Sequence, residues 1–138
     1  MHGFMDDGVD DRIRSLRDFF DRSIEISSKI NGYKNLKIAD KYIEIAKVMI
    51  DEYQTINFRL EDKQKKAYLS YFEKCLVESF EIKKEILGVK DEQTRAICYE
   101  LYQFYIESYM ENSLDKDIIE VMKDSEKALY YGKLYLGD

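Results

Sequence analysis

Apolar side chains recur every three or four residues along most of this 138-residue chain, which is the period of an α-helix. In the first such segment these positions are Ile13, Leu16, Phe20 and Ile24. The chain contains no proline, the residue type that most strongly breaks helices. We therefore expect five helices, over about residues 12–30, 36–55, 61–87, 92–112 and 114–136.

Capping residues and glycines mark the ends of these segments. The expected N-caps are Asp10 or Asp11, Asn35 and Asp91. The expected C-terminal stops are Asn31-Gly32, Gly88 and Gly137. Asp124 and Ser125 lie inside the last segment and predict an interruption of that helix.

No segment alternates apolar and polar residues over enough positions to predict a strand. The composition, 45% hydrophobic and 36% charged, is that of a globular protein. We expect an all-α fold, an antiparallel helical bundle or stacked helix pairs, with about three-quarters of the residues helical. Residues 1–9 are expected to form a flexible leader and residues 10–138 a single helical domain.

The net charge and the two cysteines indicate which partners and which cellular compartment suit this chain. The net charge of −6 has the wrong sign for a nucleic-acid partner or an anionic membrane surface. No apolar run reaches the ~18 residues that a membrane span requires. Cys75 and Cys98 lie within helical patterns and are expected to be buried free thiols, which favours a cytoplasmic location.

The residue inventory argues against catalysis. His2, in the leader, is the one histidine, so no histidine-based acid–base pair or triad can form. Two isolated cysteines cannot supply a zinc site, and the six glycines make no phosphate-binding loop. The many carboxylates are interspersed with lysines, as on a solvated face. We expect a protein that is not an enzyme and has no cofactor and no metal.

Tyrosine use is high, at twelve residues. The segment 92–112 carries Tyr99, Tyr102, Ile106 and Tyr109 along one side. These rings can lie at the core boundary with their hydroxyls in water, or form a recognition surface, because tyrosine suits both. They are the candidate partner-binding residues.

Several short motifs follow one another along the chain: Leu16-Arg17-Asp18 with Ser23–Lys29, Asp40-Lys41-Tyr42 with Ile45–Val48, Glu78–Ile86, Arg95, Tyr102–Met110, and Asn112-Ser113 with Asp115-Lys116. Their order resembles the 14-3-3 family of helical adaptors, from its fourth helix to its eighth. The resemblance covers about residues 12–130, with an insertion around residues 51–60.

This resemblance implies a non-catalytic adaptor that binds a protein or peptide partner in a helical groove. The family holds phosphopeptides with a lysine, two arginines, a tyrosine and an asparagine. Its Arg-Tyr pair falls here at Ile43 and Glu44, and its asparagine falls at Leu101. Because a glutamate repels a phosphate dianion, phosphopeptide recognition is doubtful in this chain.

Two alternatives stay open. Ala39–Ala46 followed by Leu60–Ile86 also resembles the first half of the family, with Lys74 at a pocket lysine and Glu81 where an arginine belongs. The chain can instead be a tetratricopeptide-like or generic helical protein-interaction module. If the chain is a truncated adaptor, the first two helices expose apolar faces, so we expect a homodimer or larger assembly.

Overall fold

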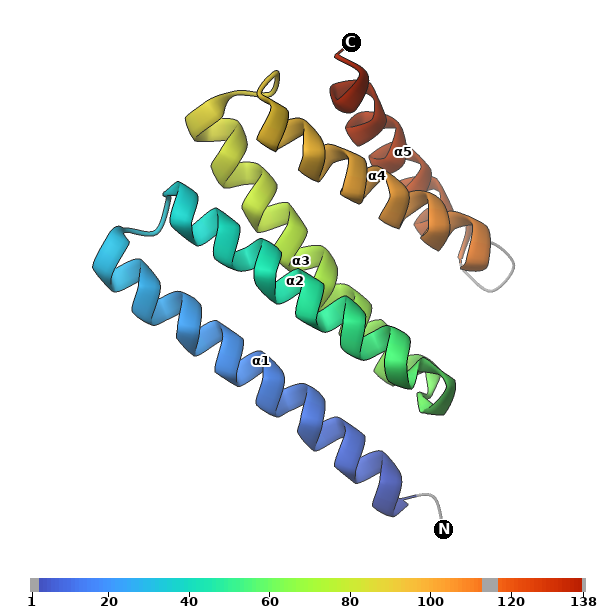
Figure 1. Cartoon of the computed structure of the whole chain (residues 1–138). Helices are drawn as coiled ribbons and strands as arrows, with labels where there is room; N and C mark the ends of the chain where they lie inside the picture. The colour runs from blue at the N-terminus through green and yellow to red at the C-terminus, as the bar shows by residue number, and fades with distance from the viewer. Residues whose placement is uncertain (1–2, 113–116, 138) are drawn as a thin grey trace. The chain divides into compact units, whose positions relative to one another are not determined.

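The computed structural model describes residues 3–112 and 117–137, except for the side chains of residues 3–7, 9, 109, 111 and 112. The structure is 90% helical, and its described residues contain no strand, which confirms the all-α prediction (Figure 1). The helices are α1 (Gly3–Asn31), α2 (Leu36–Ile56), α3 (Asp62–Leu87), α4 (Glu92–Asn112) and α5 (Ile118–Leu136), with a 3₁₀-helix η1 (Asn57–Arg59).

The capping residues confirm most of the predicted helix ends. The side chain of Asn35 accepts a hydrogen bond from the Ile38 backbone N–H at 3.0 Å, which begins α2. Asp91 accepts one from the Gln93 backbone N–H at 2.8 Å, in the turn that begins α4. Gly32 has φ +88°, the left-handed conformation that a glycine adopts without strain, and it ends α1.

The predicted start of the first helix and the predicted interruption of the last helix are wrong, and in both places an aspartate bonds to another helix. α1 begins at Gly3 and not near residue 12; the carboxylate of Asp10 accepts a hydrogen bond from Gln64 of α3 at 3.2 Å. α5 runs without interruption through Asp124, whose carboxylate accepts one from Ser108 of α4 at 3.2 Å. A side chain engaged in this way does not compete for its own backbone.

The chain forms two compact units, residues 1–79 and residues 80–138, here called the N-terminal unit and the C-terminal unit. The flexibility of residues 1–9 and a single domain over residues 10–138 stay predictions.

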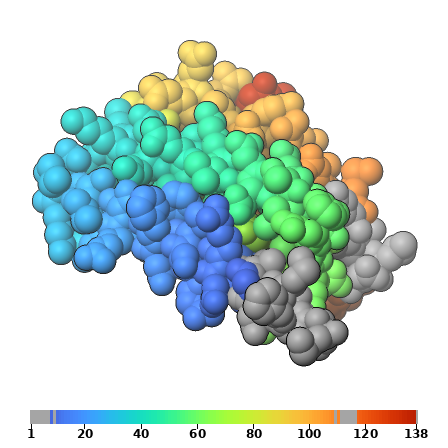
Figure 2. Space-filling view, turned by 60° about the horizontal axis from the view of Figure 1, so that its bottom comes forward, coloured from blue at the N-terminus to red at the C-terminus, as the bar shows by residue number. Residues whose placement is uncertain are grey.

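The N-terminal unit is held together by its side chains. α1 packs along α2 (Figure 2). Inside the unit, the Ser79 hydroxyl of α3 donates a buried hydrogen bond to the Ala39 carbonyl of α2 at 2.8 Å. The hydroxyl of Tyr71, also in α3, donates to the Asp21 carboxylate of α1 at 2.7 Å. α3 is thereby tied to both other helices of the unit.

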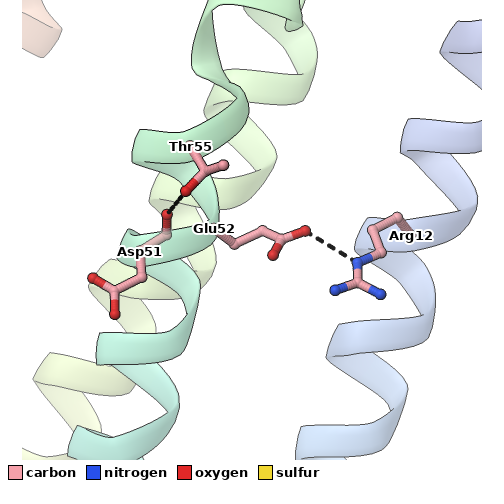
Figure 3. Close-up of polar contacts among 4 residues, drawn as sticks. All are labelled: Arg12, Asp51, Glu52 and Thr55. Carbon is pink, nitrogen blue, oxygen red and sulfur yellow. Dashed lines mark hydrogen bonds and ion pairs between the residues drawn. The ribbon is translucent and has the colours of Figure 1, made fainter.

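An ion pair joins α1 to α2 at the surface. Arg12 Nε lies 3.0 Å from Glu52 Oε1 (Figure 3). Beside this pair on α2, the Thr55 hydroxyl donates a hydrogen bond to the backbone carbonyl of Asp51, one turn earlier in the helix. The bond to Glu52 raises the pKa of Arg12 above its usual value. Since the arginine is largely exposed, the pair adds little to stability.

The C-terminal unit is built on an antiparallel hairpin of α4 and α5, which pack along their lengths (Figure 1). A row of three aromatic rings crosses its core. The Phe80 ring of α3 meets the Tyr131 ring of α5 edge to face, with 5.2 Å between centroids. Tyr131 in turn stacks on Tyr105 of α4 at 5.8 Å. These contacts join three helices through side chains that water hardly reaches.

Both cysteines are buried free thiols, as predicted. Burial raises the pKa of the Cys75 thiol to about 12 and that of Cys98 to about 11. Cys75 lies in the N-terminal unit and Cys98 in the C-terminal unit.

Tyr71→Phe is expected to reduce stability by about 1–2 kcal/mol near neutral pH, because it removes a hydrogen bond to a carboxylate. Burial and this bond raise the pKa of Tyr71 well above 10.0, so the folded protein keeps the phenol neutral where the unfolded chain ionises. The contribution of Tyr71 is therefore complete below pH ~10 and is lost as the pH rises further. Urea unfolding from pH 7 to pH 11 measures the difference between the two proteins.

Tyr33→Phe is the matched control for this change, since Tyr33 is 66% exposed. At each pH in this range, the Tyr33→Phe protein should unfold at the same urea concentration as the wild-type protein. A gap between wild type and Tyr71→Phe that stays constant above pH 10 would contradict the assigned role of the Tyr71 hydroxyl.

Candidate partner-binding surface

Three half-exposed tyrosines form one surface of the α4–α5 hairpin. Tyr99 and Tyr102 project from α4, and Tyr135 projects from α5. These residues are 40%, 37% and 37% exposed. Each ring therefore has one part packed against the hairpin and one part in water. We call Tyr99, Tyr102 and Tyr135 the tyrosine surface.

Arg95 of α4 fixes one end of this surface. Its Nε and Nη2 atoms donate hydrogen bonds to the Tyr135 carbonyl at 2.9 and 2.6 Å. Its guanidinium also lies over the Tyr135 ring, 5.6 Å from the centroid. The Tyr135 carbonyl belongs to the last turn of α5, where carbonyls have no partner within the helix. Arg95 thus caps α5 and immobilises a tyrosine in one arrangement.

The two other rings are held by neighbours on the hairpin. Tyr99 lies against Tyr135 with ring centroids 5.0 Å apart, and Gln103 donates a hydrogen bond to the Tyr99 hydroxyl at 2.8 Å. Tyr102 lies over Gly132 of α5, where an added Cβ would be only 3.0 Å from Tyr102 Cδ1. The glycine leaves room for the ring to lie close to the α5 backbone.

The structure brings together part of the predicted set. Tyr99 and Tyr102 share a surface, and Ile106 is half-buried on the same helix. The side chain of Tyr109 lies outside those that the structure describes. Sequence reasoning missed Arg95, Gly132 and Tyr135 as parts of this surface. A glycine inside a helical pattern is the one signal that could have indicated a close approach at residue 132.

The positions compared with the 14-3-3 pocket in the preferred register, Ile43, Glu44 and Leu101, include no basic residue. Leu101 is completely buried, Ile43 is half-buried and Glu44 is exposed. In the second register, Lys74 Nζ lies over the Tyr71 ring at 5.6 Å, and Glu81 is paired with Lys84 at 3.0 Å. Binding of a phosphate requires several cations, and the two sets together contain one, Lys74.

A separate apolar strip lies on α1, in the N-terminal unit. Phe19, Ile26 and Ile30 are 68%, 53% and 77% exposed. They repeat at helical spacing beside the buried positions Ile13, Phe20 and Ile24. These side chains are a second surface that a partner can cover.

Comparison with protein-family models, with curated proteins and with solved structures finds no match to this chain. Among the residues that the structure describes, no group of three or more His, Cys, Asp or Glu side chains could hold a metal ion. None of the described helices combines the length and the apolar character needed to span a membrane.

Proposed function

We propose that this chain is a non-catalytic adaptor that binds a protein or peptide partner through the tyrosine surface of α4 and α5. The observation that supports this most is the fixed pair of Tyr99 and Tyr135 rings, held by Arg95 and half open to water. Aromatic rings that are already immobile lose little entropy on binding, and tyrosine adds a hydroxyl that can bond to a peptide backbone.

The composition of the surface suits this role. Tyrosine and arginine are among the residue types enriched at protein-binding sites, and they often carry much of the binding energy there. Arg95 engages Tyr135 at the edge of the surface, while the rings of Tyr99 and Tyr102 supply contact area. An apolar or aromatic side chain of the partner would pack on these rings.

Selection from a random-peptide display library tests this proposal. Peptides that bind the wild-type protein should lose at least about tenfold in affinity toward a Tyr99→Ala/Tyr102→Ala variant, about 1.4 kcal/mol. The matched control is Phe19→Ala/Ile26→Ala, which alters exposed apolar side chains on α1. Peptides whose binding depends on the α1 positions, and not on the tyrosines, would overturn the proposal.

We also propose a divergent, partial relationship to the 14-3-3 adaptors, which rests on the order of sequence motifs. The alternative, a tetratricopeptide-like or generic helical interaction module, draws support from the α4–α5 hairpin, in which Tyr102 packs on a glycine of the neighbouring helix. In either case the tyrosine surface is the proposed binding site.

The family's usual activity is the binding of phosphopeptides, and neither the divergent adaptor nor the generic module is expected to have it. A phosphopeptide with a typical 14-3-3 recognition sequence is expected to bind no better than its unphosphorylated twin. Ile43, Glu44 and Leu101 supply no cation, and the protein carries a net charge of −6. Fluorescence anisotropy on the peptide pair measures this. A gain of tenfold or more would show that lysines rebuild the pocket, and Lys41, Lys47 and Lys74 would be replaced first.

A further inference from the structure

α5 carries a second apolar stripe on the side that faces solvent. Its inner side, with Ala128 and Tyr131, is buried. On the outer side, Ile118, Met122, Leu129 and Leu136 are 72%, 56%, 59% and 69% exposed. Four large apolar side chains that share one exposed line on a helix are a feature typical of an interface.

The spacing of this stripe is that of a coiled-coil seam. With the small residues Ser125 and Gly132 included, its members follow one another at intervals of four and three, in the order Ile118, Met122, Ser125, Leu129, Gly132 and Leu136. At 100° per residue these six positions fall within an arc of about 80°. Ile119 and Tyr130 are also exposed, outside this arc. A strip that repeats every 3.5 residues on average fits a partner helix. We call it the α5 seam.

The seam is complementary to itself when two copies of α5 run antiparallel. With the two-fold axis near Lys127, Met122 lies opposite the partner's Gly132, and Ser125 lies opposite the partner's Leu129. Ile118 meets the partner's Leu136 at each end. Leu129 then faces the partner's Ser125, a small residue, and Met122 packs against the partner's Tyr102 ring, which lies over Gly132. A shift of seven residues in either direction leaves two of the six positions without a counterpart.

Charges beside the seam favour the same arrangement. Glu126 and Lys133 are exposed along one edge of the seam. In an antiparallel pair that edge faces its own copy, and side chains lean toward the N-terminus of their helix. Glu126 therefore leans toward the partner's Lys133, and the symmetry creates this ion pair twice. A parallel pair would instead place these charges beside Val121, Ala128 and Tyr135, which carry none.

We propose that two copies of this chain associate through the α5 seam, antiparallel and about a two-fold axis near Lys127. The interface is isologous, so it closes at a dimer. It includes the Gly132 position on which Tyr102 lies, so the partner's Met122 packs beside that ring. α5 has 19 residues and is about 28 Å long, which is short for an interface, so the dimer should dissociate in the micromolar range. This proposal does not depend on the proposed function.

Analytical ultracentrifugation of the full chain over a series of concentrations tests the dimer. Leu129→Glu should raise the dissociation constant about a hundredfold, because two leucines leave the interface and two charges enter it. Ile26→Glu, which alters a similarly exposed apolar residue on α1, should leave it unchanged. If Leu129→Glu lowers the helical circular dichroism signal, Met122→Glu takes its place.

A charge reversal separates self-association from binding to another helix. Glu126→Lys and Lys133→Glu should each weaken the dimer about fivefold, and the double variant should restore it, because the pairs re-form with reversed signs. Restoration is expected only when Glu126 faces the partner's Lys133.

Cysteine pairing settles the direction of the helices. An Ile118→Cys chain mixed with a Leu136→Cys chain should give the mixed disulfide in excess of both symmetric ones. An excess of symmetric disulfides would show a parallel pair and overturn the proposal. So would a monomer at high micromolar concentration, or a dimer that Ile26→Glu dissociates and Leu129→Glu does not.

Discussion

Phe80→Ala is expected to destabilise the C-terminal unit by about 3–5 kcal/mol, the range measured when a buried phenylalanine is truncated. Phe80 is 0% exposed and begins the row of rings that continues through Tyr131 to Tyr105. Alanine would leave a cavity at the point where α3 meets α5, and Tyr131 would lose its edge-to-face contact. A loss of this size is a large part of the total stability of a small domain.

Urea unfolding followed by far-ultraviolet circular dichroism measures this change. Phe58→Ala is the matched control, because Phe58 is 79% exposed and its ring lies beside the guanidinium of the neighbouring Arg59. The control should shift stability by less than about 0.5 kcal/mol. Equal effects of the two changes would mean that the aromatic row does not hold the unit together.

Leu101→Asn is expected to cost about 4 kcal/mol, although asparagine is what the 14-3-3 resemblance places at this position. Leu101 is 0% exposed, so the change removes a buried apolar side chain and inserts an amide that must find hydrogen bonds in the core. The variant should unfold at a much lower urea concentration and gain no affinity for a phosphopeptide.

Met110→Asn on the same helix is the control for Leu101→Asn. Met110 is 71% exposed, so its replacement should change stability only by the small difference in helix propensity. A Leu101→Asn protein that keeps its wild-type stability and binds a phosphopeptide would show that position 101 can face a groove, contrary to the structure.

Much of the fold follows from local signals in the sequence. Asn35 and Asp91 cap helices where predicted, because a side-chain oxygen that reaches a free backbone N–H two or three residues ahead is a strictly local arrangement. The buried residues Ile38, Ala46 and Met49 also lie on stripes that the helical period identifies. Such features depend on one segment at a time.

Features that depend on two segments were not predictable in the same way. Phe19 and Phe20 are adjacent and chemically alike, yet one is 68% exposed and the other 9%, because the position of α2 decides which side of α1 is covered. The tyrosine surface also depends on how two helices pack against each other. Tyr135 joins Tyr99 only because α5 returns along α4 in one register, and nothing near residue 135 encodes that register.

The placement of the thiols gives each unit its own chemical reporter. Thiol reagents attack the thiolate, and burial holds the pKa of Cys75 at about 12 and that of Cys98 at about 11, so neither reacts while its surroundings stay closed. Cys75 should become labelled when the N-terminal unit opens, and Cys98 when the C-terminal unit opens. Mass spectrometry of the two peptides after timed labelling would then measure two opening rates in one unmodified protein.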